Sequence, residues 1–440
     1  MNIITKKIIE NKKILSLVSL VIFLVAVAMA GAGAMIFYYF KYGAVSQNEE
    51  PKTENTSTFI IPEINREMVV WKINEGKEFL LRAENKETGG FYKMYDVLKD
   101  DFGKQVHTVY SASIVYTFLK IYEFDKDQRI QDNIGKWADF LLSMQNQDKK
   151  DKRYGAFSYS YDLEKKEKEK KYVVGTSALN ILTLLKLYES NTDQRYLEAS
   201  KLAGDWLITM QEEDGGMKQY ARYDESKQKW VFATKESFLY DGQVLTALSR
   251  LYKKTGEKKY YNSAEKIAKR LAELYEEKRG YIVDEVRTEN PISNSWVVMS
   301  LTEFYKNANP NKRYKDIVFE LAEKIAKNQK TNSKNLLNQG MWNGAYSTSG
   351  VGWISEVMTE IYQFCLEEKT GDCEKYKNAA ISATRWLMQN TYSKDNNPSY
   401  LKNPAMANGG IYWNSKNLYV RTDSNCHGLN SYIGIVNEIE

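Results

Sequence analysis

Three carboxylic acids stand where an acid is unusual. Asp241 occurs in a Tyr-Asp-Gly-Gln run, Glu356 interrupts an apolar segment, and Asp423 precedes a predicted helix. Cleavage of a glycosidic bond uses two carboxyl groups, one protonated as the acid and one ionised as the base or nucleophile. Asp241 with Glu356 or Asp423 can supply such a pair. The alternatives are a solvated or salt-bridged face for Glu356 and a helix cap paired with Arg421 for Asp423.

Histidine, tyrosine and arginine side chains favour a second reaction, removal of a proton next to the carboxylate of a uronic acid. An arginine neutralises the carboxylate while a tyrosine or histidine exchanges the proton. The run Arg421-x-Asp423-x-x-x-His427 holds three suitable groups, and His107 begins another predicted helix. The candidate catalytic residues are therefore Asp241, Glu356, Asp423, His427 and His107, although a lone histidine such as His107 is often structural.

Aromatic and arginine side chains near these groups suit sugar binding, since rings stack on the apolar faces of sugars and guanidinium groups bind acidic substituents. The predicted substrate-binding residues are Tyr110, Tyr240, Asn294, Trp296, Trp353, Arg222, Tyr223, Trp342, Trp413 and Arg421. We expect no cofactor and no metal site, because three Cys and two His lack further ligands at a recognisable spacing. Cys426 reads as a buried thiol.

A repeated turn organises the chain. The stretch from Trp206 to Met217 ends a helix with Met-Gln, a polar stop and Gly-Gly before a large apolar residue. Related copies end at Phe91, Phe157, Met217, Tyr281, Tyr346 and Ile411, and successive copies are 60 to 66 residues apart. Glycine suits a helix end because it adopts the left-handed conformation without a Cβ clash. Six copies at a nearly fixed period indicate a repeat architecture.

Two kinds of helix alternate from about residue 66. The amphipathic, predicted outer helices are 69–81, 130–144, 196–211, 260–274, 314–328 and 376–390. The more apolar, predicted inner helices end near Tyr122, Tyr188, Tyr252, Tyr305 and Tyr362, with a sixth around 427–436. Ten residues before each of those five tyrosines stands a small residue that allows close helix packing, namely Ala112, Ala178, Gly242, Ser295 and Gly352, and Gly428 is aligned with them. These patterns predict an all-α fold, an (α/α)6 toroid of six helical hairpins, over residues 66–440.

Polar or aromatic residues precede most of the small positions, for example Tyr240 and Asp241 before Gly242. Such a ring indicates either a wet, functional cavity or helix caps and first-turn residues. With the hairpin count and the turn signature, the chain resembles the six-hairpin toroid superfamily. That superfamily includes glycoside hydrolases, polysaccharide lyases and sugar epimerases, with terpenoid cyclases and protein prenyltransferases as relatives. The resemblance implies that an active site lies in the central cavity, where the inner helices begin.

Short sequence motifs help to distinguish among these families. The run from Arg421 to His427 weakly resembles the C-terminal Arg-Asp-His signature of glucuronyl C5-epimerases. An Asp-x-Asp-Asp motif, as in protonating terpenoid cyclases, is absent from the sequence, and the Asp, Cys and His zinc ligands of prenyltransferases are scarce. A terpenoid cyclase or prenyltransferase is therefore the less favoured relative.

The N-terminus predicts a membrane anchor. Residues 1–13 are a basic cytoplasmic tail, residues 14–40 contain no charged residue, and residues 41–65 form a polar, flexible linker. An uncharged run of this length can span a bilayer, and the lysine-rich side stays cytoplasmic, which places the large domain outside the cytoplasm. A cleaved signal after Ala28-Met29-Ala30 is the alternative.

Charge and cysteine content restrict the classes of molecule that the chain is expected to bind. The net charge of +5 includes the lysines beside residues 14–40, and no basic stripe with interleaved aromatics indicates nucleic-acid binding. Cys365 and Cys373 flank a short turn and can form a disulfide outside the cytoplasm. We expect a single-pass, membrane-anchored, extracytoplasmic protein that acts on a polysaccharide or oligosaccharide as a hydrolase, lyase or uronate C5-epimerase. The alternative is a non-catalytic toroid that binds a glycan or a protein.

Overall fold

Long helices of two kinds alternate along the chain. The structure is a computed structural model that describes residues 64–233, 235–287, 290–331, 336–394 and 397–439. The outer helices are α2 (Arg66–Arg82), α4 (Gln128–Ser143), α6 (Gln194–Thr209), α8 (Lys258–Lys278), α10 (Lys312–Lys327) and α12 (Glu374–Gln389). The inner helices are α3 (Thr108–Asp125), α5 (Val174–Asn191), α7 (Phe238–Thr255), α9 (Pro291–Asn307), α11 (Thr348–Glu368) and α14 (Thr422–Ile435). The predicted alternation is confirmed.

Short connections join each inner helix to the next outer helix. Inner helices α3 and α5 end at Lys126 and Thr192, whose φ angles of 54° and 59° are left-handed. The next residues, Asp127 and Asp193, accept hydrogen bonds from backbone N–H groups in the first turns of α4 and α6. A left-handed residue ends one helix and an N-cap starts the next, so the chain reverses direction within two residues.

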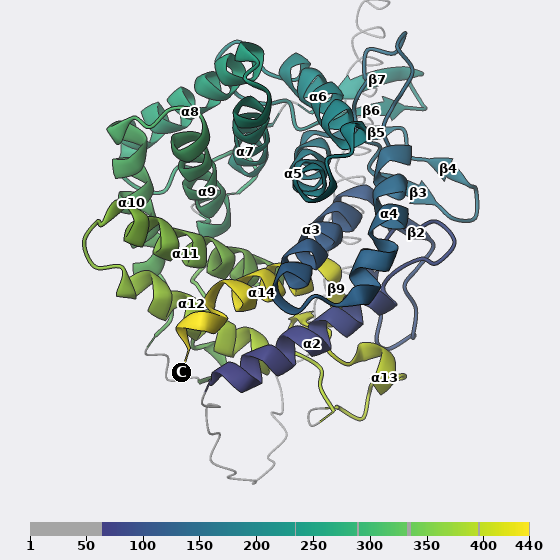
Figure 1. The fold of residues 1–440 in the computed structure, drawn as a ribbon, viewed down its shortest axis with the longest axis vertical. Helices are drawn as coiled ribbons and strands as arrows, with labels where there is room; N and C mark the ends of the chain where they lie inside the picture. The colour runs from purple at the N-terminus through teal and green to yellow at the C-terminus, as the bar shows by residue number, and fades with distance from the viewer. Residues whose placement is uncertain (1–63, 234, 288–289, 332–335, 395–396, 440) are drawn as a thin grey trace, which may run out of the picture. The chain divides into compact units, whose positions relative to one another are not determined.

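Small residues let the inner helices approach one another closely. A Cβ atom added to Gly242 would lie 2.8 Å from the Trp296 carbonyl oxygen, and one added to Gly352 would lie 3.1 Å from Cβ of His427. The side chains of Ala112, Ala178 and Ser295 are fully buried at the equivalent positions. Figure 1 shows the inner helices arranged around a centre, with the outer helices around them.

The small position of the sixth inner helix needs a correction. The sequence alignment placed it at Gly428. In the structure the buried Cys426 occupies it, because Asn425 before it makes the same contact to a Gly turn that the equivalent residues of other hairpins make. The alignment was two residues too far along the chain.

The glycine turn after an outer helix packs against the next outer helix. Gly155, with a φ of 89°, has no room for a side chain, because an added Cβ would lie 2.3 Å from the Leu202 carbonyl oxygen of α6. In the fifth hairpin Gly340 fills this position, with a φ of 96° and the carbonyl oxygen of Ser382 at 2.2 Å from an added Cβ. The fifth copy of the turn therefore ends at Trp342, and the predicted marker Tyr346 is wrong.

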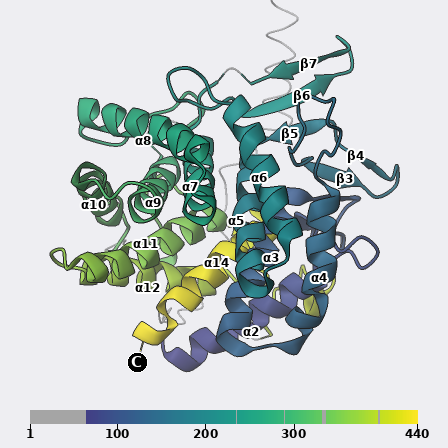
Figure 2. The same cartoon turned by 45° about the horizontal axis from the view of Figure 1, so that its top comes forward.

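Short strands extend from the ring of helices at the N-terminal ends of the inner helices. Each of three antiparallel sheets joins neighbouring hairpins. The sheets are β1 (Met94–Tyr95), β9 (Asn417–Arg421) and β8 (Tyr412–Asn414); β2 (Gln105–His107), β3 (Ser160–Asp162) and β4 (Glu167–Lys168); and β5 (Lys171–Val173), β6 (Tyr220–Asp224) and β7 (Lys229–Phe232). Figure 2 shows β3 to β7 gathered beside α4, α5 and α6.

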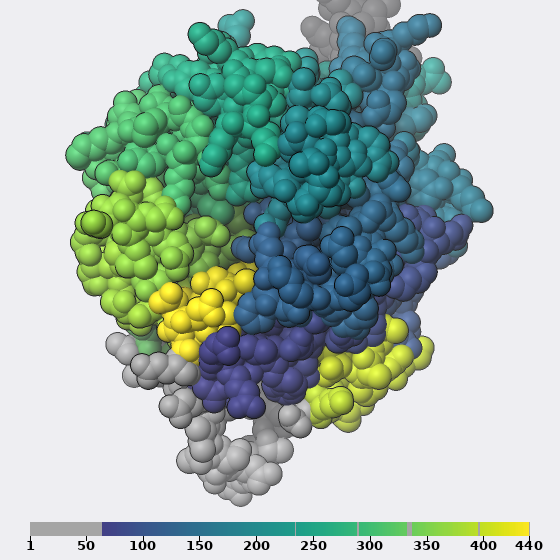
Figure 3. All heavy atoms as spheres, in the orientation of Figure 1, coloured from purple at the N-terminus to yellow at the C-terminus, as the bar shows by residue number. Residues whose placement is uncertain are grey.

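The first and last helices close the ring. Gly76 of α2 lies against Leu429 of α14, so that an added Cβ would be 2.8 Å from Cδ2 of Leu429. The turn glycine Gly409 packs against the Glu75 carbonyl oxygen of α2, as Gly89, Gly155, Gly215 and Gly340 pack against later outer helices. In Figure 3 the C-terminal residues lie between α2 and the helices α11 and α12. The closure predicted for the sixth inner helix is confirmed.

The predicted segments 1–13 and 14–40, and residues 41–63 of the linker predicted over 41–65, lie outside the described residues. Within the described part of the chain, no helix combines the length and the apolar character that crossing a bilayer requires. The anchor therefore stays a prediction. Cys365 at the end of α11 and Cys373 before α12 form a disulfide, and Cys426 is a buried free thiol.

Candidate functional site

A cavity of about 470 Å³ lies at the centre of the ring, lined by residues of all six inner helices and by loops at their N-terminal ends. Two positions of every inner helix contribute to its wall. The residues directly after the small positions are Ser113, Leu179, Gln243, Trp296, Trp353 and His427. The residues four after the small positions are Tyr116, Leu182, Thr246, Met299, Glu356 and Asn430. Positions three apart share a helix face, so they form two successive layers.

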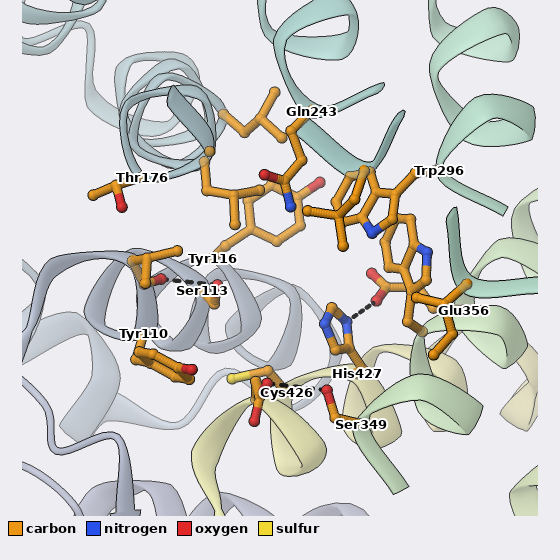
Figure 4. A pocket seen from close by; sticks show the side chains of 18 of the residues that line it. Tyr110, Ser113, Tyr116, Thr176, Gln243, Trp296, Ser349, Glu356, Cys426 and His427 are labelled. Atoms are coloured by element: carbon orange, nitrogen blue, oxygen red, sulfur yellow. Dashed lines mark hydrogen bonds and ion pairs between the residues drawn. The ribbon is translucent and has the colours of Figure 1, made fainter. Parts of the chain in front are cut away.

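A histidine and a carboxylate form a pair on this wall. Nδ1 of His427 lies 2.8 Å from Oε2 of Glu356 (Figure 4). Nδ2 of Asn430 donates to Oε1 of the same carboxylate at 2.9 Å. A carboxylate with two such partners accepts hydrogen bonds, so Nδ1 of His427 carries a proton and Nε2 has a free lone pair. The imidazole is 21% exposed, and Nε2 is hydrogen-bonded to no side chain in the described part of the protein. This pair can exchange a proton with a ligand in the cavity.

Charged side chains form a further layer below Glu356. Lys120 of α3 lies 4.0 Å from Glu356 and 3.9 Å from Glu360. Burial alone would lower the pKa of Lys120, but these two carboxylates raise it above its usual value. Across the ring, the Arg250 guanidinium binds both oxygens of Glu303. Lys120 therefore places a positive charge beside the carboxylate of Glu356.

A second polar group lies at the loop end of the cavity. Arg421 binds both carboxylate oxygens of Asp423 and donates a 2.8 Å hydrogen bond to the hydroxyl of Tyr110. Ser349 also donates to Asp423, at 3.0 Å. Burial raises the pKa of Tyr110, so its phenol keeps its proton. Arg421 and Tyr110 offer hydrogen-bond donors and positive charge to a negatively charged oxygen.

Aromatic rings form the remaining wall near His427. Trp296 and Trp353 stack with ring centroids 3.7 Å apart, and Trp353 meets the His427 ring edge-on at 5.3 Å. Trp413 lies under the Arg421 guanidinium, 4.1 Å from its ring centroid. The indole Nε1 of Trp353 has no hydrogen-bond partner in the structure. Aromatic faces next to a proton-exchanging pair suit a sugar ring.

The structure brings together nine of the residues singled out in the sequence. These are Glu356, Asp423, His427, Tyr110, Tyr240, Trp296, Trp353, Trp413 and Arg421. Six others do not line this cavity, and three of those have a clear structural role.

Asp241 and Asn294 hold the turns. Oδ1 of Asp241 accepts from the backbone N–H of Met217 at 3.1 Å, and Oδ1 of Asn294 accepts from Ile282 at 2.9 Å. The equivalent residues Ser111, Ser177 and Asn425 make the same contact to Phe91, Phe157 and Ile411. Burial raises the pKa of Asp241 well above its usual range. The expected position of Asp241 at the cavity mouth is therefore corrected, since each of these polar residues satisfies a buried turn.

Trp342 and His107 also lie away from the cavity wall. Trp342 is fully buried and donates its indole N–H to the Ile325 carbonyl oxygen, because it is the turn residue of the fifth hairpin. His107 lies edge-on to Tyr110 and Tyr159, behind rings that line the cavity. Arg222 and Tyr223 belong to strand β6, outside the cavity lining, and Tyr223 packs against Trp230.

The sequence did not single out several lining residues, including Gln243, Tyr116 and Asn430. These residues lie one or four positions after a small residue, whereas the expected ring lay one and two positions before it. Of that expected ring, Tyr110, Thr176 and Tyr240 line the cavity. Burial raises the pKa of the Cys426 thiol, which makes it a poor nucleophile. Among the described residues, no three His, Cys, Asp or Glu side chains converge as metal ligands do.

Comparison with solved structures gives the same architecture. A cellobiose 2-epimerase from Bacillus thermoamylovorans matches with a TM-score of 0.67 and 12% identity over 85% of this chain and 99% of its own. The chain has the (α/α)6 toroid fold. An α-mannanase from Bacteroides thetaiotaomicron matches at 0.61 with 12% identity, over 84% and 96% of the two chains. An unsaturated glucuronyl hydrolase specific for heparin matches at 0.58 with 10% identity, over 84% and 98%.

These neighbours are sugar-active enzymes that share the toroid. At 10 to 12% identity the likeness shows the fold alone. A scan against models of protein families found no match to the sequence, and a sequence search of curated proteins found none.

Proposed function

We propose that the chain is a carbohydrate-active enzyme that moves a proton at a carbon atom of an oligosaccharide, with His427 as the acid–base group. The observation that carries this proposal is the His427–Glu356 pair on the wall of an aromatic-lined cavity. Glu356 holds the tautomer with a free Nε2 and stabilises the imidazolium that forms when Nε2 takes a proton. The epimerase and isomerase among the structural neighbours add support.

The reaction follows from the groups around this pair. Nε2 of His427 removes a proton from a carbon next to a carbonyl or carboxyl group, and the electron pair moves onto that group's oxygen. Arg421 and the Tyr110 hydroxyl, 2.8 Å apart, can stabilise the resulting negative charge. Return of a proton to the opposite face inverts the carbon and gives an epimerase. Loss of a substituent from the next carbon gives a lyase.

Glycoside hydrolysis is the second candidate, because Glu356 and Asp423 both line the cavity. Hydrolysis requires one of two carboxyl groups to be protonated. Glu356 contacts His427 and Asn430, and Asp423 contacts Arg421 and Ser349, so both carboxyl groups are already engaged by protein hydrogen-bond partners. The geometry thus supports proton transfer through His427 better than it supports hydrolysis.

We also propose that residues 14–40 anchor the enzyme in the membrane, with the toroid outside the cytoplasm. The uncharged run and the lysines before it support this orientation, and the Cys365–Cys373 disulfide fits an oxidising compartment. Protease added to intact cells should remove the toroid and leave a short anchored fragment. Protection of the toroid until lysis would contradict the proposed orientation.

The test of the reaction is incubation of the full-length chain with oligosaccharides in deuterated water. An epimerase or isomerase incorporates deuterium at one carbon, a lyase generates an unsaturated end, and a hydrolase releases shorter chains without carbon-bound deuterium. Deuterium exchange that disappears in His427→Gln supports the proposal. Hydrolysis without exchange favours the second candidate, and binding without turnover indicates a glycan-binding toroid.

A further inference from the structure

Two lysines lie beside the loop end of the cavity without an acidic partner. Lys93 precedes strand β1, and Lys171 begins strand β5. Neither forms an ion pair within 4.0 Å in the described part of the chain, whereas the nearby Lys104 and Lys170 do. Both side chains are only partly exposed, so their charges are incompletely solvated. We call Lys93, Lys171 and Arg421 the basic cluster.

The basic cluster surrounds two tyrosines of the cavity wall. The Lys93 ammonium lies 5.6 Å from the Tyr110 ring centroid, and that of Lys171 lies 4.5 Å from the Tyr159 ring centroid. The Arg421 guanidinium lies 5.6 Å from the Tyr110 ring centroid as well. Strand pairing fixes this arrangement, because Met94, next to Lys93, pairs with Arg421. Lys93, Lys171 and Arg421 therefore each place a positive charge beside Tyr110 or Tyr159, two tyrosines of the cavity wall.

Nearby carboxylates do not balance this charge. Asp423 is engaged by Arg421, and Glu169 accepts a hydrogen bond from Ser160 at 2.8 Å. Burial lowers the pKa of Lys93 and the charges of Arg421 and Lys171 lower it further, while the charge of Asp423 raises it in part. Burial is also the main reason that the pKa of His107, behind the two tyrosines, falls to about 4, and the two lysine charges add to this effect. Crowded cations of this kind are stabilised when an anion binds among them.

The ligand that fits is an acidic glycan. We propose that the basic cluster binds a carboxylate or sulfate group of the oligosaccharide that occupies the cavity. This inference rests on the proposed function and adds the substrate class to it. Lys93 also lines a second hollow of about 490 Å³, so its ammonium is reachable from outside the main cavity. In this arrangement Arg421 binds both the reacting group and the anionic group of the oligosaccharide. Lys93 and Lys171 bind the anionic group and thereby favour acidic over neutral glycans.

The experiment measures binding of the full-length chain to matched oligosaccharides. A glycan array carries neutral, uronate-containing and sulfated oligosaccharides of equal length, and dissociation constants are measured for each hit. We expect hits among the acidic glycans, with binding that weakens as salt rises. The uronate and sulfate arms identify which anion is bound. For the best acidic hit, Lys93→Gln with Lys171→Gln should raise Kd about 10- to 100-fold.

Lys258→Gln with Lys266→Gln is the matched control, because it removes the same charge from exposed lysines of outer helix α8. It should leave Kd within about twofold, and melting temperatures of both double variants show whether they are folded. Binding and turnover of neutral glycans only would overturn the acidic-substrate inference and leave the proposed function standing. Acidic hits that respond equally to both double variants would also overturn it. If no glycan binds, both the inference and the proposed function fail.

Discussion

Nδ1 of His427 lies 2.8 Å from Oε2 of Glu356, although 71 residues separate the two in the sequence. They come from neighbouring inner helices, α14 and α11. Such a pair has two distinct members, a base that meets the substrate and a carboxylate that orients it. The two roles predict different consequences of substitution.

Substitution His427→Gln should lower kcat by about 100- to 10,000-fold, because it removes the proton-exchanging nitrogen. Glu356→Gln keeps the shape but not the charge, so it should lower kcat by about 10- to 1,000-fold and shift the pH dependence of kcat/KM. Binding of the oligosaccharide, measured by calorimetry, should persist in both variants. Steady-state rates between pH 5 and 9 provide the comparison.

Glu360→Gln is the control for Glu356→Gln, since Glu360 lies one turn further along α11, also near Lys120, and is 44% exposed. Its kcat should stay within about threefold of the parent value. Equal losses in Glu356→Gln and Glu360→Gln would assign the effect to the charge of Lys120 and argue against a specific role of the pair.

Asp241→Asn should leave activity unchanged. The new side chain still offers an oxygen to the Met217 N–H, and Asp241 is not part of the cavity lining. Because burial raises the pKa of Asp241, the fold favours its protonated form. The contribution of this group to the free energy of unfolding is therefore lost as the pH rises above the ordinary pKa of an aspartic acid. At pH 8 the asparagine variant should therefore melt at the same or a higher temperature. Asp241→Ala leaves the Met217 N–H without its acceptor, so it should lower the free energy of unfolding by about 1–3 kcal/mol.

His107 should make the fold less stable in mild acid. Its pKa is about 4 in the fold, against 6.5 ordinarily, so the unfolded chain binds more protons between these values. The free energy of unfolding therefore falls as the pH drops from 6.5 to 4, by at most about 3 kcal/mol from this group. In urea titrations, the free energy of unfolding of His107→Gln should rise relative to that of the parent as the pH falls from 6.5 to 4. A constant difference would contradict the assignment.

Gly155→Ala should destabilise the fold by about 2–4 kcal/mol, because it combines a left-handed backbone with a clash against Leu202. Gly256→Ala is the matched control. It has a φ of 70° but nothing within 4 Å of an added Cβ, so it should lose only about 1 kcal/mol. Thermal unfolding of the two variants separates the clash from the backbone strain, and equal losses would show that the contact with α6 does not matter.

The hairpins could be predicted because their signals are local. Caps, left-handed residues and apolar periodicity act within a few residues, so all six outer helices start within three residues of the predicted positions. The prediction of the fifth turn was wrong because Gly344-Ala345-Tyr346 matches the sequence signature, whereas Gly340-Met341-Trp342 forms the turn in the structure. Only the contact of Gly340 with the next outer helix distinguishes the two, and that contact is not local.

The site could be predicted only in part, for the same reason. Polar residues before the small positions suggested a cavity, and the structure uses Ser111, Asp241 and Asn294 to satisfy turn N–H groups instead. The partner of Glu356 could not be read from the sequence, since it depends on how α11 and α14 face one another. How the two helices face one another depends on Cys426, rather than Gly428, occupying the small position of α14.

Closure of the ring by α2 and α14 has a consequence for biosynthesis. Leu429, which covers Gly76, lies about 350 residues after it, whereas α2 is the first helix of the toroid. During synthesis, the face of α2 around Gly76 therefore stays uncovered until the residues of α14 have left the ribosome. The nascent chain presents two open edges throughout this period, and docking of the final helix removes both at once. A chain that stops before residue 422 keeps them, which makes early termination a direct route to aggregation.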